Sequence, residues 1–357
     1  MKNIKAGIAI FFVIALSLLP PIDFYIKNFS NDYWTWMICI AGFLGCLTIF
    51  LNTNIFVKII AVAGFINCFF SIAPYISFTA YISLIGCCYL YIFCSTIKNW
   101  KLVFNMIQAV AIFNIILLIL QFFGHDQLLN FGGASKSINN FEFGGIGQHM
   151  KMGSFSVILT SLLIIVSPWW CLFSVVVGLF CKSTWTLIAV SCGTLFINKK
   201  LFIGIFIIGV FSCVLLHKIP EFKAYSGRLP VWQKTIQLAD KRPFWGVGIG
   251  TYKLVFAPLA RLNYSVWKTA HNDWLEILFE TGYPGLFFVV IMTGWLFFLL
   301  WFKQDYICLA GLTIIAVDMV SHFPMRMMNT VPLIILFLAL CEQRIKYEYN
   351  IFKDDVS

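Results

Sequence analysis

The sequence predicts an all-α polytopic membrane protein with about twelve transmembrane helices. Apolar residues make up 61% of the chain and charged residues only 11%, against roughly 45–50% and about 25% in soluble domains. The apolar runs are long and nearly free of charge, and about 20 such residues suffice to cross a bilayer. The predicted spans are residues 4–22, 34–51, 55–73, 76–94, 102–123, 152–167, 169–181, 184–197, 201–216, 284–302, 306–321 and 329–342.

Two of these assignments need comment. The span 4–22 follows Lys2 and Lys5 like a secretory signal, but it ends in Pro20-Pro21 without a small-residue cleavage site, so we predict an uncleaved first helix. The spans 169–181 and 184–197 are short, and they are either two crossings or one re-entrant hairpin.

Basic residues in the short connections predict the orientation of the chain. By the positive-inside rule these connections face the cytoplasm, which places both termini there. The loops 124–151 and 217–283 are then external, and we expect one integral membrane domain, residues 1–357, capped by the loop 217–283. The basic residues on the cytoplasmic side are Lys2, Lys5, Lys98, Lys101, Lys199, Lys200, Lys303, Arg344 and Lys346.

The loop 217–283 carries nine Lys or Arg residues against five Asp or Glu residues. This excess indicates an anionic ligand, and the alternative is a solvated loop that touches acidic lipid. No nucleic-acid-binding module is visible. All twelve cysteines lie in predicted spans, so disulfides and Cys-based zinc sites are not expected. The Asp-x-Asp clamp that holds a metal-bound nucleotide is missing, so we expect neither metal nor cofactor.

The segment Thr269-Ala270-His271-Asn272 precedes a predicted helix that starts at Asp273 and ends at Gly282. Asn272 or Thr269 can cap this helix, and either choice leaves His271 at its positive end, where the imidazole tends to stay neutral. A neutral imidazole can accept a proton from a hydroxyl. From the residues alone, His271 is either a general base or a polar cap of the loop.

A second helix is predicted to start at Gly227-Arg228 and to lie at the membrane surface, with an apolar stripe of Trp232, Ile236 and Ala239. A guanidinium group can hold phosphate oxygens bidentately, so Arg228 is a candidate phosphate ligand, and the alternative is a solvated side chain. The alternating glycines of Gly246-Val247-Gly248-Ile249-Gly250 indicate either a backbone cradle for an anion or a tight turn.

Asp318 and His322 lie four residues apart near the outer end of a predicted span, so they share a helix face, and Arg326 follows. Charged groups inside a membrane usually face a polar cavity. The alternative is a shallow position in contact with water.

The segments GRLPVWQKTIQLADKRPFWGVGIGTY and TAHNDWLEILFETGYPGL, within residues 225–290, resemble the signature of the bacterial O-antigen ligase and polymerase superfamily. This resemblance implies a GT-C-like membrane glycosyltransferase that uses undecaprenyl-diphosphate-linked glycans at the external face of the cytoplasmic membrane, without metal or nucleotide. The acceptor is the lipid A core of lipopolysaccharide for a ligase and another lipid-linked glycan for a polymerase. A transporter or flippase of lipid-linked sugars is the alternative from another class.

The resemblance also implies roles for particular residues. His271 becomes the base that takes the proton of the acceptor hydroxyl, and Arg228 neutralises the departing diphosphate. We expect inversion at the sugar, because that course needs only one general base. Many members carry Ser-Arg where this chain has Lys182-Ser183, so a phosphate contact there falls to Lys182. The further residues expected to bind diphosphate or glycan are Arg261, Lys253, Arg326, Asn272 and His322.

Overall fold

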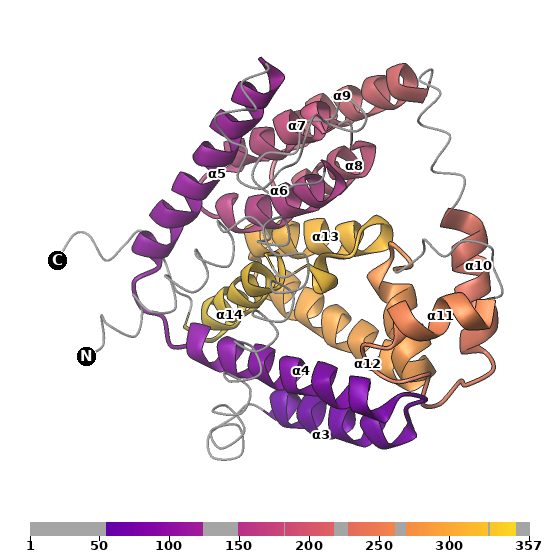
Figure 1. The fold of residues 1–357 in the computed structure, drawn as a ribbon. Helices are drawn as coiled ribbons and strands as arrows, with labels where there is room; N and C mark the ends of the chain where they lie inside the picture. Colours follow the sequence, from indigo (N-terminus) through magenta and orange to yellow (C-terminus); the bar gives the residue numbers. More distant parts are fainter. Residues whose placement is uncertain are drawn as a thin grey trace.

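The chain is helical wherever its structure is described. The computed structural model describes residues 55–123, 149–181, 183–217, 228–260, 269–327 and 329–347, and within these ranges helices are joined by turns without any β-strand (Figure 1). The predicted all-α class is therefore confirmed. The predicted spans 4–22 and 34–51, most of the loop 124–151, and the candidate residues Lys182 and Arg261 lie outside the described residues.

Each predicted span from residue 55 onward corresponds to a helix. The α-helices are α3 (Ile55–Phe70), α4 (Pro74–Cys94), α5 (Trp100–Phe122), α6 (His149–Leu163), α7 (Cys171–Phe180), α8 (Thr184–Thr194), α9 (Lys199–His217), α10 (Arg228–Ala239), α11 (Tyr252–Ala260), α12 (Asp273–Phe302), α13 (Tyr306–Ser321) and α14 (Val331–Tyr347). Two 3-10 helices, η4 (Pro168–Trp170) and η6 (Pro324–Arg326), precede α7 and follow α13.

Three helices in the described ranges, α4, α5 and α12, are long and apolar enough to cross a membrane. Others are apolar but shorter, such as α3 and α13, each of 16 residues. A helix of that length spans about 24 Å, which is less than the ~30 Å of the hydrocarbon core. The positions of the predicted spans therefore agree with helices, whereas the number of about twelve crossings is not confirmed.

The ambiguous pair of spans forms two short helices that pack against each other. α7 has 10 residues and α8 has 11, so each is only about 15 Å long. Lengths of this kind favour a re-entrant hairpin over two full crossings.

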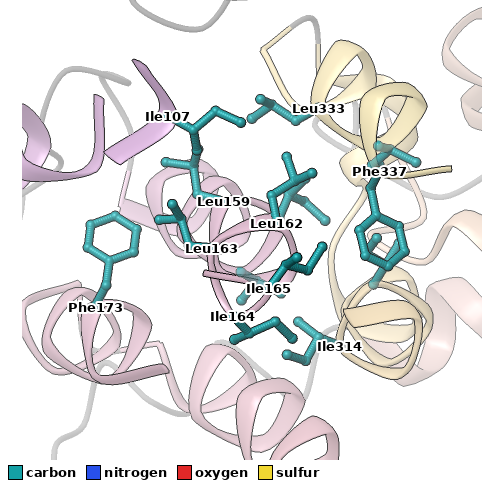
Figure 2. Close-up of a cluster of buried hydrophobic side chains, with 14 of the residues drawn as sticks. Ile107, Leu159, Leu162, Leu163, Ile164, Ile165, Phe173, Ile314, Leu333 and Phe337 are labelled. Carbon is teal, nitrogen blue, oxygen red and sulfur yellow. The ribbon is translucent and has the colours of Figure 1, made fainter. Parts of the chain in front are cut away.

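The main core surrounds α6, in which every side chain from Met152 to Leu163 is buried. Figure 2 shows apolar side chains converging on it from α5, α7, α13 and α14, among them Ile107, Phe173, Ile314 and Phe337. α13 packs against both α6 and α8, so its C-terminal end, where His322 follows, is held by the core.

α8 and α13 cross at close range in this core. A Cβ added to Gly193 would lie 2.9 Å from the carbonyl oxygen of Ala310 and 2.3 Å from Cγ1 of Ile314. Small residues at helix crossings let backbones approach each other, which is how helices pack tightly in lipid. The position of α13 therefore depends on a residue without a side chain on α8.

α10, α11 and the first part of α12 form a smaller unit around a second core of Val231, Leu238, Tyr252, Phe256 and Phe279 (Figure 1). Three of these side chains are in mutual ring contact, with Tyr252 stacked on Phe256 at 4.7 Å between centroids and Phe279 edge-on to both. This unit coincides with the described part of the predicted external loop 217–283.

The predicted surface helix is present as α10. Its protein-facing side carries the buried residues Arg228, Val231, Thr235, Leu238 and Ala239, and Thr235 bonds to Tyr252 at 2.9 Å. Within the predicted apolar stripe, Ala239 is buried and Ile236 is 40% exposed. The contact of this stripe with the membrane surface stays a prediction.

α12 is interrupted at Gly282, whose φ of 74° and ψ of −176° are not helical. A Cβ at this position would lie 2.5 Å from the carbonyl oxygen of Pro243, and the same oxygen accepts from the amide of Tyr283 at 2.7 Å. Gly282 therefore separates the helix that starts at Asp273 from the apolar helix that follows, as predicted.

Candidate active site

The loop that carries His271 is fixed on both sides. The side-chain oxygen of Asn272 accepts from the amide of Leu275 at 3.0 Å and caps α12. The amide of Ala270 donates to Glu276 Oε1 at 2.7 Å, and the carbonyl of Ala270 accepts from Trp232 Nε1 at 2.7 Å. These bonds tie the loop to α12 and to α10, and of the two predicted caps, Asn272 and Thr269, Asn272 is the one that caps the helix.

His271 lies in the left-handed region with a φ of 51°, which is uncommon for a residue with a side chain. Its ring packs edge-on against Phe323, with 4.9 Å between centroids. Burial, together with the charges of Arg228 and His322, lowers the pKa of His271 from 6.5 to about 3. The imidazole is therefore neutral at physiological pH, as predicted, although burial rather than the end of the helix is the main cause.

Arg228 is buried at the first position of α10, with 8% of its surface exposed. Its Nη1 donates to the carbonyl oxygen of Ser321 at 2.7 Å, so the guanidinium reaches the end of α13 and adds its charge to the surroundings of His271. The structure thus brings together the two residues for which the sequence predicts catalytic roles.

Asp318 and His322 form a buried pair at the same end of α13. His322 Nδ1 lies 2.6 Å from Asp318 Oδ1, and the side chains are 1% and 0% exposed. The hydroxyl of Ser154, from α6, donates to the other oxygen of the same carboxylate. Within the described ranges, His322 Nε2 and the hydroxyl of Ser321 are buried and have no hydrogen-bond partner.

Arg326 is held by two glutamates of α12. Its Nε lies 3.0 Å from Glu276 Oε2, and its Nη2 lies 2.5 Å from Glu280 Oε2. The second oxygen of Glu280 accepts from the amide of Tyr252 at 3.0 Å. Burial opposes the charge of Arg326, but the two carboxylates outweigh this effect and raise its pKa. These contacts favour a positioning role, and the predicted contact of Arg326 with substrate stays a prediction.

The remaining candidates are less central. Lys253 lies on the exposed face of α11, and its predicted contact with diphosphate stays a prediction. Within the described ranges, no group of three or more His, Cys, Asp or Glu side chains is arranged to hold a metal ion.

The glycine-rich segment uses its amides to pack against the rest of the fold. The amides of Val247 and Gly248 donate to the carbonyl oxygens of Phe279 and Glu280 at 3.0 and 2.9 Å, and the amide of Ile249 donates to Asn67 Oδ1 at 2.9 Å. Of the two predicted alternatives, the tight turn is therefore present. The segment joins α3 to the first part of α12.

Sequence analysis did not predict the contributions of Glu276, Glu280 and Ser154. A usable signal was present for the glutamates, because acidic residues four apart on one helix face need a cation when they are buried. No comparable signal existed for Ser154, whose partner Asp318 is 164 positions away.

Comparison with known families identifies the segment that contains much of this site. Residues 150–290 match the family model described as O-antigen ligase. The predicted resemblance is confirmed. The O-antigen ligase match begins in α6 and ends within α12, so it includes Arg228 and His271 but not Asp318, His322 or Arg326. No curated protein matches the chain.

Proposed function

We propose that this protein transfers a glycan from undecaprenyl diphosphate to an acceptor sugar hydroxyl at the external face of the cytoplasmic membrane. The observation that carries this proposal is the meeting of Arg228 and His271 within the O-antigen ligase match. One residue suits a departing diphosphate and the other suits a hydroxyl group, and the long apolar helices α4, α5 and α12 suit a lipid-linked donor.

In the proposed reaction, the acceptor oxygen forms a bond to the anomeric carbon of the donor glycan. The bond between that carbon and the phosphate oxygen breaks, and the diphosphate leaves with the electron pair. Arg228 stabilises this charge, which develops mainly in the transition state. Its bond to the Ser321 carbonyl holds the guanidinium in place before the donor arrives.

The acceptor hydroxyl must also lose a proton. His271 is neutral and half-buried, so it can accept a hydrogen bond or a proton from this hydroxyl. A single displacement of this kind inverts the configuration of the sugar, and it requires one base and no metal.

The test uses purified protein in liposomes that contain an undecaprenyl-diphosphate glycan. Lipid A core and an unextended lipid-linked repeat are offered separately as acceptors. Transfer to the core would define a ligase, and chain extension would define a polymerase.

Two variants test the site, with a third as control. His271→Ala removes the acceptor for the hydroxyl group and is expected to lower kcat/KM by about 10²–10⁴-fold, and Arg228→Lys is expected to be impaired because lysine cannot make a bidentate phosphate contact. Lys241→Ala removes an exposed charge from the same external unit and should leave turnover unchanged. Movement of labelled lipid across the bilayer without any glycan transfer would instead support a flippase.

A further inference from the structure

The pair Asp318 and His322 has the arrangement of an oriented imidazole rather than that of an ordinary buried histidine. A carboxylate only accepts hydrogen bonds, so the 2.6 Å contact places the ring proton on Nδ1 and leaves the lone pair of the neutral ring on Nε2. The hydroxyl of Ser154 holds the second oxygen of the carboxylate. The direction of the imidazole is thereby set from two helices, α13 and α6.

His322 Nε2 is buried and has no hydrogen-bond partner among the described residues, and the adjacent Ser321 hydroxyl shares this property. Buried polar atoms are almost always bonded, because desolvation without a partner costs free energy. A histidine that serves only to stabilise the core would satisfy both nitrogens. Two such atoms at the end of one helix indicate that a hydrogen-bonding ligand binds there.

His322 and Ser321 lie next to the two residues of the candidate active site, Arg228 and His271. Arg228 bonds to the backbone of Ser321 at 2.7 Å, and the ring of His271 packs on Phe323, the residue that follows His322. The titratable groups around His322 are Asp318 on its own helix, Arg228 from α10, and His271 and Asp273 from the start of α12.

The two imidazoles differ in their surroundings. Burial disfavours a proton on His271, and so does the charge of Arg228, which the proposed reaction requires at the diphosphate. His322 instead has a carboxylate at its other nitrogen. Such a carboxylate holds the imidazole in one tautomer and stabilises the imidazolium that forms.

We propose that His322 is the general base of the glycosyl transfer, that Asp318 is its positioning residue, and that His271 orients the acceptor hydroxyl. This proposal rests on the function proposed above. The hydroxyl proton passes to His322 Nε2 as the oxygen forms its bond to the anomeric carbon and the diphosphate leaves with the electron pair. The imidazolium then loses the proton to water before the next turnover.

The test compares His322→Gln with His271→Gln in the liposome assay. Glutamine retains a hydrogen-bond acceptor near the position of Nε2 but cannot take a proton. His322→Gln should therefore lose about 10²–10⁴-fold in kcat with little change in the KM for the acceptor, and its residual rate should no longer fall at acidic pH. His271→Gln should mainly raise the KM for the acceptor and retain the acidic limb of the pH profile.

A milder pair of variants keeps the proposal testable if His322→Gln does not fold. Ser154→Ala removes one hydrogen bond to Asp318 and should lower kcat by roughly tenfold or less. Ser156→Ala is the matched control, since it is buried on the same helix and bonds to the Gly153 carbonyl rather than to Asp318.

The outcomes separate the two proposals. Wild-type kcat for His322→Gln, or equal kcat for the two serine variants, would overturn the assignment of His322. Loss of the acidic limb in His271→Gln alone would return the base to His271. Absence of transfer by the wild-type protein would instead contradict the proposed function itself.

Discussion

Replacement of Arg326 by methionine is expected to lower the free energy of unfolding by about 3 kcal/mol. Arg326 lies 3.0 Å from Glu276 and 2.5 Å from Glu280, whose side chains are only 2% and 4% exposed. Removal of one partner from a buried ion pair costs about 3–5 kcal/mol, because the remaining charge has no partner in a low-dielectric site. The Arg326 side chain is 30% exposed, so water screens part of the interaction and the lower end of this range applies.

The assay is unfolding of the purified protein by SDS in mixed micelles, followed by tryptophan fluorescence. A further variant combines Arg326→Met with Glu276→Gln and Glu280→Gln. Because neutral amides need no counter-charge, this variant should regain at least half of the lost stability. Arg344→Met is the control, since Arg344 pairs with Asp305 at 2.5 Å and lies in the last turn of α14.

The reasoning would be refuted if Arg326→Met unfolded like the wild type. A higher KM for the lipid-linked donor at unchanged stability would show that Arg326 contacts substrate, as we predict from the sequence. Arg344→Met should lose stability without any change in the KM for the donor, so it separates the two effects.

A change of pH and one further substitution test the structure of the site. Acidification from pH 6.5 toward 3 should destabilise the protein. Burial, helped by the charges of Arg228 and His322, lowers the pKa of His271 to about 3. Between these pH values the unfolded chain therefore binds a proton at His271 that the folded protein excludes. Thermal unfolding of the wild type and of His271→Gln at pH 7 and pH 5 measures this loss of stability. If both proteins lost the same stability between the two pH values, His271 would be excluded as the cause. Gly282→Ala should cost about 1–3 kcal/mol, because φ is 74° and the new Cβ would meet the carbonyl oxygen of Pro243; an alanine variant as stable as the wild type would contradict this account.

Local features of the chain were predictable because they depend on neighbours in the sequence. Asn272 caps α12 as predicted, since an amide oxygen three residues before a free backbone N–H is a local arrangement. Gly282 ends the outer helix for the same kind of reason. The apolar runs place the helices correctly, although their lengths in the structure do not confirm the predicted number of crossings.

Contacts between distant residues were not predictable in this way. The periodicity of α10 is compatible with more than one buried face, and only the packing of Thr235 on Tyr252 selects the face that is buried. Arg326 and its partner Glu280 are 46 positions apart in the sequence, and no rule of local spacing connects them.

The amino-acid sequence alone was sufficient to predict a helical membrane protein that resembles the O-antigen ligase family and to single out His271 and Arg228. Apolar burial in lipid and helix capping act over a few residues, so composition and spacing carry that information. The environment of each candidate was decided by the tertiary structure. The low pKa of His271 and the orientation of His322 by Asp318 and Ser154 arise where α6, α10, α12 and α13 meet, because burial and charge act through space rather than along the chain.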